Sequence, residues 1–366
     1  MQFPKSDFRQ PNGFHTHRDF EMTLPPTIAM EFVVNAIQRA VQLGIDRQVI
    51  LKMAGLTIED IANQTKDFSL HQHIQLLEKL AVLSKDDFFG LHYGFTHHVS
   101  NFGILSYVLL NSANVGSALN SLVQYFGVWQ QGTEVALTPD GNTAWLSYQI
   151  KDVNISVRRQ DAETAIAFAI NSIRTLTRQH WYPKRVWLEH NSSKNTSEYE
   201  QVLNAPVFFN QAVNAIAIES ELLKQKVPFA DLSLLPILES RLHQFFVEKE
   251  VDNKLVTLVN QAITRSLPQG YPTIGDVATD LGFSSRTLQR YLRDRNTTYK
   301  QLVEKTRYQI SLTYLKDPEL SLTEVALLLG YSELSAFNHA FRRWTGLAPN
   351  KYRHLIGIRS KVIPRL

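Results

Sequence analysis

The stretch Ile274-Gly-Asp-Val-Ala-Thr-Asp-Leu-Gly-Phe-Ser284 returns 48 residues later as Leu322-Thr-Glu-Val-Ala-Leu-Leu-Leu-Gly-Tyr-Ser332. In both copies a polar residue precedes an apolar stripe of helical spacing, and a glycine ends the stripe. A capping residue, a periodic apolar run and a glycine are typical of a short helix that stops at a tight turn. The repeat therefore predicts two helix–turn–helix units in this part of the chain.

The start of each unit carries a helix-capping signal. Thr273 and Asp276 have the spacing of a capping box in the first copy, as Ser321 and Glu324 do in the second. The stripe that follows repeats every four residues and includes one small residue, which allows a second helix to approach closely. Its members are Val277, Ala278 and Leu281 in the first copy and Val325, Ala326 and Leu329 in the second.

Each stripe is followed by a turn signal. Gly282 and Gly330 stand where a left-handed backbone is needed, which glycine adopts without a Cβ penalty. The next residue in each copy is aromatic and is expected to return to the core, and the serine after it is expected to cap the second helix. These residues are Phe283 and Ser284 in the first unit and Tyr331 and Ser332 in the second.

The second helix of each unit has a polar face suited to DNA. Leu288 and Leu292 are predicted to face inward in the first unit, and Phe337 and Phe341 do so in the second, offset by 49 residues. Arginine pairs with guanine, and asparagine or glutamine with adenine, in the major groove. An ordinary solvent-exposed helix face would also be polar. Because such a polar face follows the turn in both copies of the repeat, we favour a role in DNA recognition. The candidate DNA-binding residues are Ser285, Arg286, Gln289, Arg290 and Arg293, then Glu333, Ser335, Asn338, His339 and Arg342.

A third helical pattern joins the two units. The segment Tyr299–Leu315 has apolar residues at helical spacing, including Leu302 and Ile310. A continuous linking helix would hold the second helices of the two units, which are the candidate DNA-reading helices, at a fixed separation. To read one face of B-DNA they must lie about one helical turn, or roughly 34 Å, apart.

Charge is concentrated in the repeat region. Residues 271–366 contain 15 Lys and Arg against 8 Asp and Glu, a net charge of +7. The whole chain carries +4, so the first 270 residues carry about −3. A local positive balance is the electrostatic footprint that DNA phosphates require.

These motifs resemble the DNA-binding domain of the AraC/XylS family of bacterial transcription regulators. The resemblance rests on Val277-Ala-x-x-Leu-Gly-Phe-Ser284, Arg286-Thr-Leu-Gln-Arg290, Val325-Ala-x-x-Leu-Gly-Tyr-Ser332, Phe337-x-x-Ala-Phe-Arg-Arg-Trp-Thr-Gly346 and Pro349-Asn-Lys-Tyr-Arg353. It implies an all-α domain over residues 271–355 that binds double-stranded DNA and contacts RNA polymerase. His339 and Ser311 depart from the residues most often found in this family, which are Arg and Ala.

The first 270 residues predict an α+β domain with a small antiparallel sheet. Helical patterns cover 28–43, 70–83, 115–129 and 162–178, and a longer one covers 237–266 before the Pro/Gly-rich stretch 267–272. A hairpin is expected from 135–138 and 144–150, which flank a turn-rich loop. Further strands are expected within 184–190, 207–209 and 215–218.

Part of this region resembles the arabinose-binding-like domain of regulators related to those of ornithine catabolism. The matching residues are Phe102-Gly-Ile-Leu-Ser-Tyr-Val108, Ala113-Asn-Val-Gly-Ser-Ala-Leu119, Tyr125, Trp181-x-Pro183, Val186-x-x-x-His190 and Ala205-Pro-Val-x-Phe209. The resemblance implies a homodimer that senses a small-molecule effector, whose identity and binding residues stay unknown. The expected division is a loose leader (1–27), an effector-binding and dimerisation domain (28–230), a connecting helix and hinge (231–270), the DNA-binding domain (271–355) and a tail (356–366).

Several residues in this domain allow more than one interpretation. His71, His73, His92, His97 and His98 suggest a metal site, but neighbours in a helix diverge, so no metal ligand is expected. The pair Arg158-Arg159 suits an anionic ligand but is more typical of a structural pair at a helix start. Four tryptophans are expected in the core or in a pocket lining, namely Trp129, Trp145, Trp181 and Trp187.

Other features limit the class of protein. The chain has no cysteine, which excludes disulfides and thiolate ligands, and it has no apolar run long enough for a membrane span or a signal peptide. It lacks the common phosphate-loop, dinucleotide, hydrolase and zinc-protease motifs, so no cofactor is expected. We therefore expect a cytoplasmic protein, nucleoid-associated when bound to DNA.

The expected function is effector-controlled, sequence-specific transcription regulation without enzymatic activity. Two alternatives remain at this point. In the first alternative, the N-terminal domain only dimerises and binds no ligand. In the second, which fits the motifs less well, the N-terminal domain is an enzyme fused to the DNA-binding domain.

Overall fold

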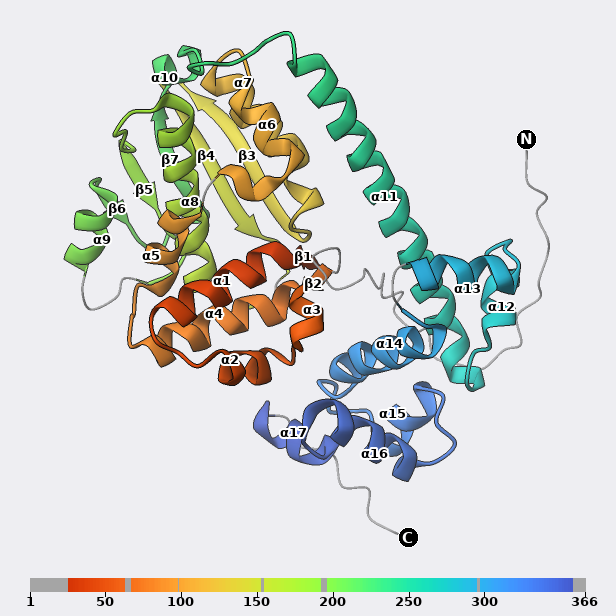
Figure 1. Ribbon diagram of the computed structural model, residues 1–366. Coiled ribbons are helices and arrows are strands. Elements are labelled where there is room, and N and C mark those ends of the chain that lie inside the picture. Colours follow the sequence, from red (N-terminus) through yellow and green to blue (C-terminus); the bar gives the residue numbers. More distant parts are fainter. Residues whose placement is uncertain are drawn as a thin grey trace. The chain divides into compact units, whose positions relative to one another are not determined.

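The computed structural model describes residues 26–62, 67–97, 99–152, 155–191, 196–294 and 297–357. The chain forms two compact units, the first built mainly from residues up to 256 and the second mainly from residue 257 onward. Helix α11 (Leu235–Ser266) carries the chain from the first unit into the second (Figure 1). The predicted fold class, an α+β region followed by an all-helical one, is confirmed.

The N-terminal unit contains a five-stranded sheet with the order β3-β4-β7-β5-β6. The strands are β3 (Thr133–Asp140), β4 (Thr143–Ile150), β5 (Arg185–Trp187), β6 (Val207–Phe208) and β7 (Asn214–Glu219). The predicted hairpin is confirmed as the antiparallel pair β3–β4. The expectation of an entirely antiparallel sheet is wrong at one edge, where β5 and β6 are parallel. Their connection includes helix α9 (Thr196–Leu203), which provides the crossover that a parallel pair requires.

Helices and a two-stranded sheet complete this unit. Strands β1 (Thr27–Ala29) and β2 (Asp67–Ser69) pair in an antiparallel manner, so the helix expected from residue 28 begins only at Met30. The helices are α1 (Met30–Gln42), α2 (Arg47–Ala54), α3 (Ile58–Ala62), α4 (Leu70–Ser84), α5 (Phe89–Thr96), α6 (Ile104–Leu110), α7 (Val115–Tyr125), α8 (Arg159–Thr177) and α10 (Ser220–Lys224), with 3-10 turns η1 (Val99–Phe102) and η2 (Phe126–Val128). The leader, except its last two residues, and His98 lie outside the described residues.

One face of the large sheet packs against α7 and α8 (Figure 1). Leu146 and Ile216 point to this face and are buried, because successive residues of a strand alternate between faces. Helix α8 also packs very closely against α5. A Cβ added at Gly90 would lie 2.0 Å from the carbonyl oxygen of Gln160, so only glycine fits there. This close approach brings the residues of α5 and α8 to the walls of one pocket.

The buried apolar residues of this unit form two clusters. The larger lies between the sheet, α7 and α8 and includes Phe102, Leu122 and Ile166. The smaller is built mainly by α1, α2 and α4 and reaches Tyr93 and Tyr148. Three partly buried residues pack against both clusters, namely Phe32, Phe126 and Val135. The two clusters therefore meet along a seam, and the pocket described below lies there.

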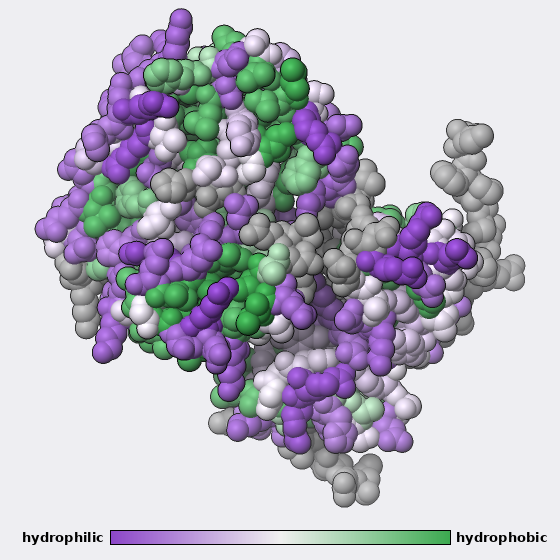
Figure 2. Space-filling view, viewed as in Figure 1, coloured by the Kyte–Doolittle hydropathy of each residue, from purple (hydrophilic) through white to green (hydrophobic). Residues whose placement is uncertain are grey.

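The C-terminal unit is helical in the part of the chain that the structure describes. After the end of α11 and the 3-10 turn η3 (Leu267–Gln269), it contains α12 (Ile274–Asp280), α13 (Ser285–Asp294), α14 (Tyr299–Tyr314), α15 (Leu322–Leu328), α16 (Leu334–Thr345) and α17 (Pro349–Leu355). The predicted helices of both repeats and the linking helix are confirmed. On the face seen in Figure 2 this unit is mostly purple and white, whereas the N-terminal unit shows larger green patches. No described helix has the length and apolar character needed to span a bilayer.

Candidate DNA interface and effector pocket

Both helix–turn–helix units begin with the predicted caps. The Thr273 hydroxyl accepts a hydrogen bond from the Asp276 backbone N–H at 3.2 Å. In the second unit Ser321 Oγ accepts from the Glu324 N–H at 3.2 Å, and Glu324 Oε2 accepts from the Ser321 N–H at 2.7 Å, which completes a capping box. Hydrogen bonds from the Ser321 side chain and from its backbone N–H lower the pKa of the Glu324 carboxyl, because they favour its charged form. The caps satisfy N–H groups that the first helical turn leaves unpaired.

Both first helices end in the same turn. Gly282 and Gly330 have φ of 73° and 72°, the left-handed conformation predicted for them. The next N–H in each copy bonds back to the first helix, from Phe283 to Ala278 O at 2.8 Å and from Tyr331 to Ala326 O at 2.9 Å. This is the Schellman arrangement, which pairs the last carbonyls of a helix. The repeat in sequence is therefore a repeat in backbone geometry.

Two of the side-chain predictions near the turns are wrong. Phe283 is 39% exposed, because its backbone bonds back to the first helix while its side chain stays at the surface. Ser284 caps α13 as predicted by accepting from the Thr287 N–H, but Ser332 is not the cap of α16. Helix α16 begins one residue later relative to its glycine, so the cap position falls on Glu333. The extra residue in this turn explains the offset of 49 between the second helices.

The second helices of the two units, α13 and α16, are called the reader helices below. Each buries one face and exposes the other. Leu288, Leu292, Phe337 and Phe341 are all at most 3% exposed, as predicted. Nine of the ten candidate DNA-binding residues are exposed, and Asn338 is half-buried. In α16 the Ser335 hydroxyl donates to Glu333 Oε2 at 2.9 Å, so these two polar groups bond to each other at the helix start.

An arginine that the sequence did not mark supports the second turn. Arg307 of α14 is 6% exposed, and its Nη2 donates to the carbonyl of Gly330 at 2.7 Å. Its guanidinium lies 4.2 Å from the ring centroid of Tyr331 and 5.0 Å from that of Tyr271. Cation–π contact and the hydrogen bond together hold the turn that precedes α16. This buried arginine therefore fixes the turn that leads into α16.

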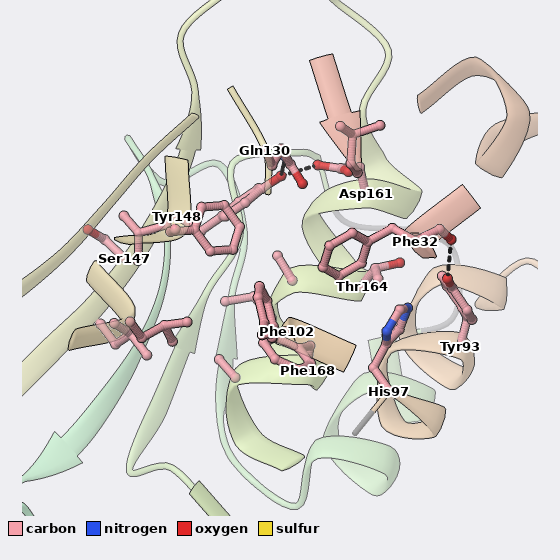
Figure 3. Close-up of a pocket in the computed structure, with 18 of the residues that line it drawn as sticks. Phe32, Tyr93, His97, Phe102, Gln130, Ser147, Tyr148, Asp161, Thr164 and Phe168 are labelled. Carbon is pink, nitrogen blue, oxygen red and sulfur yellow. Dashed lines mark hydrogen bonds between the residues drawn. The ribbon is translucent and has the colours of Figure 1, made fainter. Parts of the chain in front are cut away.

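A pocket of about 70 Å³ lies in the N-terminal unit, along the seam between its two apolar clusters. Figure 3 shows Phe32, Phe102, Phe168 and His97 around it. The rings of Phe32 and Phe102 are 5.3 Å apart and those of Phe102 and Phe168 are 5.1 Å apart, so they form one connected aromatic wall. Helices α1, α4, α5, α7 and α8 and strands β3 and β4 all contribute to the lining.

A short chain of hydrogen bonds crosses one side of this pocket (Figure 3). Gln130 Nε2 donates to the Tyr148 hydroxyl at 2.6 Å, and this hydroxyl donates to Asp161 Oδ2 at 2.6 Å. Burial raises the pKa of Asp161 to about 6, and the hydrogen bond from Tyr148 opposes that shift. Burial raises the pKa of Tyr148 well above its ordinary value, so it stays a hydroxyl donor. One sequence feature could have indicated this pocket. Asp161 lies on the apolar face of α8, four residues before Ala165 and seven before Phe168, where a carboxylate is unusual.

The histidines do not assemble into a metal site in the described part of the chain. His71 bonds to Gln75 on the exposed side of α4, whereas His73 is 3% exposed and lines the pocket. The two side chains diverge, as expected for neighbours in a helix. Burial, with a smaller effect from His97, lowers the pKa of His73 to about 3 and keeps it neutral. His92 bonds to Asp86 at 2.8 Å on another part of the surface.

The paired arginines and the tryptophans have mostly structural roles. Arg158 donates twice to Glu189 Oε2, at 3.1 and 2.8 Å, and Arg159 donates to the Asp87 carbonyl at 2.8 Å. The structural interpretation of this pair is therefore favoured over an anion site. Trp129 and Trp181 are buried as expected. The expectation is wrong for the other two, because Trp145 and Trp187 are half-buried and stack at 3.9 Å on the outer face of the sheet, above small alanines of β7.

A second buried carboxyl on α8 lies outside the pocket. Glu163 is 0% exposed and accepts a hydrogen bond from Tyr199 at 2.5 Å, with Arg159 3.5 Å away. Burial raises its pKa to about 7, although both partners oppose the shift. Burial also lowers the pKa of the neighbouring His190. Glu163 is thus a structural counterpart of Asp161, with the same helix and the same kind of tyrosine partner.

The raised pKa of Glu163 makes stability depend on pH. Its folded pKa lies above the unfolded value of 4.5, so its contribution is complete below pH 4.5 and is lost as pH rises through 7. Relative to Glu163→Gln, the parent protein should lose about 3 kcal/mol of unfolding free energy between pH 4.5 and pH 8. Urea unfolding of the two proteins at several pH values measures this difference. If the difference in unfolding free energy between the two proteins stays constant with pH, the raised pKa of Glu163 is wrong.

Known proteins share both parts of this architecture. Residues 44–227 match the model of the arabinose-binding domain of AraC transcription regulators, and residues 277–354 match a helix-turn-helix domain model. The ornithine utilization regulator of Pseudomonas aeruginosa is 27% identical over 336 residues, covering 92% of this chain and 98% of that protein. The regulator VirS of Mycobacterium tuberculosis is 26% identical over 297 residues, covering 80% and 86%.

A solved structure also aligns along most of the chain. The transcriptional regulator CdpR from Pseudomonas aeruginosa aligns with 87% of this chain and 98% of its own, at 22% identity and a TM-score of 0.43. The arabinose-binding domain model spans half of the chain, and the helix-turn-helix model covers the repeated units. The chain therefore belongs to the AraC family of DNA-binding transcription regulators.

Proposed function

We propose that the protein is a homodimeric regulator in which a small-molecule effector, bound in the N-terminal unit, controls how the two reader helices engage DNA. The observation that carries this proposal is the pair of identical Schellman turns, each followed by a helix with a buried apolar face and an exposed polar face. Such a helix, entered through a fixed turn, is the element that these proteins place in the major groove. The proposed domain limits are those predicted from the sequence, 28–230 for the sensor and 271–355 for the reader.

The ten candidate residues of α13, of α16 and of its N-cap Glu333 are proposed to contact DNA, with two kinds of role. Arg286, Gln289, Arg290 and Asn338 have side chains able to pair with base edges. The remaining residues suit phosphate contacts or orientation of neighbours, as the Ser335–Glu333 hydrogen bond does. The net charge of +7 over residues 271–366 supports the phosphate contribution.

Control by an effector requires that it bind two states of the protein with different affinities. Coupling of this kind is typically about 1–3 kcal/mol. A domain that only dimerises needs no internal cavity, whereas this one has an aromatic pocket between its two cores. We further propose a cytoplasmic location, on the nucleoid when bound to DNA, and a contact with RNA polymerase.

The proposed reading role of α13 is tested by Arg290→Ala. If Arg290 pairs with a guanine, binding should weaken by about 1–3 kcal/mol, with the loss concentrated at one base pair. Fluorescence anisotropy on an operator obtained by genomic footprinting, and on single-base variants of it, measures this effect. Arg343→Ala is a matched control, since it removes the same charge from a residue that bonds to Glu304 and lies outside the candidate set.

Two other outcomes would change this assignment. An equal loss on all sequences, with a smaller salt dependence, would mean that Arg290 contacts a phosphate. Unchanged binding on every sequence would remove Arg290 from the interface and contradict the proposed role of α13.

A further inference from the structure

We propose that the pocket between the two apolar clusters is the effector site and that it takes a small, mainly apolar, uncharged molecule carrying one hydrogen-bond donor, with phenol as the simplest example. This inference deepens the proposed function and rests on it. It names the position of the site, the chemistry of its ligand and the residue that recognises the donor.

The size and lining of the pocket favour a compact apolar ligand. Protein interiors are normally close-packed, so a void of about 70 Å³ within a core is unusual. Phe32, Phe102, Phe126 and Phe168 present ring faces and edges to this space. Such rings receive another small ring with favourable edge-to-face contacts. The lining therefore has the chemistry of a pocket for a small aromatic molecule. A cavity of roughly 150 Å³ binds benzene, so the lining side chains must move apart slightly when a ring enters this pocket of about 70 Å³.

The polar groups of the lining are few, and most are already occupied. The Tyr93 hydroxyl donates to the Phe32 carbonyl at 2.9 Å, and the Thr164 hydroxyl donates to the Gln160 carbonyl at 2.7 Å. Tyr148 accepts from Gln130 and donates to Asp161. A ligand therefore finds these hydroxyl protons engaged.

Among the lining residues, Asp161 and His73 keep capacity for a ligand. Asp161 is 4% exposed and accepts one hydrogen bond, from Tyr148, which leaves acceptor capacity on its carboxyl group. His73 is 3% exposed, and its buried Nδ1 has no hydrogen-bond partner. A buried polar atom without a hydrogen-bond partner destabilises the empty site. A ligand that hydrogen-bonds to this nitrogen removes that cost, which strengthens its binding. Because Gln130 donates to Tyr148, the hydroxyl proton of Tyr148 points to Asp161 and the carboxyl remains an acceptor.

The same lining disfavours charged and highly polar ligands. No arginine or lysine is among the lining residues, so an anion would face the Asp161 carboxyl without a countercharge. A sugar or a zwitterionic amino acid would bring more polar groups than the pocket has partners. Each buried group left unpaired would weaken binding by roughly tenfold or more. The pocket is thus unlike one built for a sugar or for a zwitterionic amino acid.

The test compares four probes of similar size on the purified full-length protein, namely phenol, toluene, benzoate and benzylamine. Phenol should bind saturably by calorimetry, about 10- to 100-fold more tightly than toluene, because only phenol donates a hydrogen bond to Asp161. Benzoate should bind more weakly than toluene, because its carboxylate would face the Asp161 carboxyl without a countercharge. Benzylamine should bind more weakly than phenol, because its ammonium ion must lose its water in a mainly apolar pocket. Benzylamine binding more tightly than phenol would overturn the assignment of an uncharged ligand. Phenol binding no tighter than toluene, or benzoate as the best ligand, would overturn the proposal.

Asp161→Asn separates recognition from folding. Tyr148 donates to residue 161, so the asparagine turns its oxygen to Tyr148 and its NH₂ group to the ligand. Phenol then exchanges a hydrogen bond donated to a carboxylate for a weaker one accepted from a neutral amide. Phenol binding should weaken about 10-fold while toluene binding stays the same. Equal loss of both probes would assign Asp161 a structural role only. Glu163→Gln, on the same helix with the same kind of tyrosine partner but outside the pocket, should leave both probes unchanged.

Failure of this inference is distinguishable from failure of the proposed function. DNA affinity is measured by anisotropy with and without saturating phenol, in the parent and in Asp161→Asn. Phenol that binds the parent but leaves DNA affinity unchanged would support the site and contradict effector control. A DNA affinity that responds to benzoate and not to phenol would support effector control and overturn the assigned ligand chemistry.

Discussion

Replacing Gly330 with alanine should destabilise the C-terminal unit by about 4 kcal/mol, whereas the same change at Gly282 should cost about 1 kcal/mol. The two glycines hold the same position in the repeat and have nearly the same φ, 72° and 73°. Each alanine therefore suffers the same left-handed strain, of roughly 1–2 kcal/mol. What differs is the space that the new methyl group meets.

At Gly330 that space is filled by backbone. A Cβ would lie 2.6 Å from the carbonyl oxygens of both Leu267 and Gly270, whereas at Gly282 nothing lies within 4 Å. Backbone at the end of α11 cannot move aside as a flexible side chain can, so overpacking adds about 1–3 kcal/mol to the strain. The Arg307 hydrogen bond to the Gly330 carbonyl would be disturbed as well.

Hydrogen exchange of peptides from residues 257–357 measures the free energy of opening in this unit alone, without assuming two-state unfolding of the chain. Gly282→Ala serves as the matched control in the same experiment. Equal costs at the two glycines would contradict the close approach of η3 to the second turn.

Replacing Arg353 with methionine should cost about 3–5 kcal/mol, because three carbonyls lose their donor, and should weaken binding to every DNA sequence equally. Arg353 is 0% exposed. Its Nε donates to the Leu315 carbonyl at 3.1 Å, and its Nη2 donates to the carbonyls of Tyr314 and Asp317 at 3.4 and 3.2 Å. These carbonyls lie at the end of α14 and just beyond it, where a helix leaves its last carbonyls without internal partners.

Methionine fills much of the volume of Arg353 but donates no hydrogen bond, so several buried carbonyls lose their partner at once. Arg343→Met is the control, because its ion pair with Glu304 is exposed and such pairs contribute about 0–1 kcal/mol. Thermal unfolding and DNA anisotropy should both separate the two variants. A loss of stability at Arg353 no greater than at Arg343 would show that the end of α14 does not depend on this guanidinium.

The helix–turn–helix region of the molecule was largely predictable from the sequence. The helix starts at Thr273 and Ser321, the left-handed turns at both glycines and the buried faces of α13 and α16 were all predicted correctly. Each of these features depends on residues within about one or two helical turns of each other. The errors at Phe283 and Ser332 arose where one extra turn residue, or a side chain with no local partner, decided the outcome.

The pocket was not predictable in the same way. The sequence left the effector-binding residues unknown, and the lining of the proposed effector site combines residues from α1, α4, α5, α8 and β4. Tyr148 and Asp161 lie on different elements, and their hydrogen bond forms only after β4 and α8 pack together. A carboxylate on an apolar helix face was the one signal present, and it does not say which residue lies opposite.

The sequence alone thus determined the fold class, the two reader helices and the family, because caps, glycines and periodic apolar residues act over a few neighbouring positions. Tertiary structure alone decided which of the two equivalent glycines tolerates a methyl group. It also decided which buried arginine donates hydrogen bonds to the carbonyls at the end of α14. It also decided which of two similar carboxyls on α8 faces a cavity. The physical reason is that each of these properties depends on atoms brought together from distant parts of the chain, and periodicity records only the face that is buried.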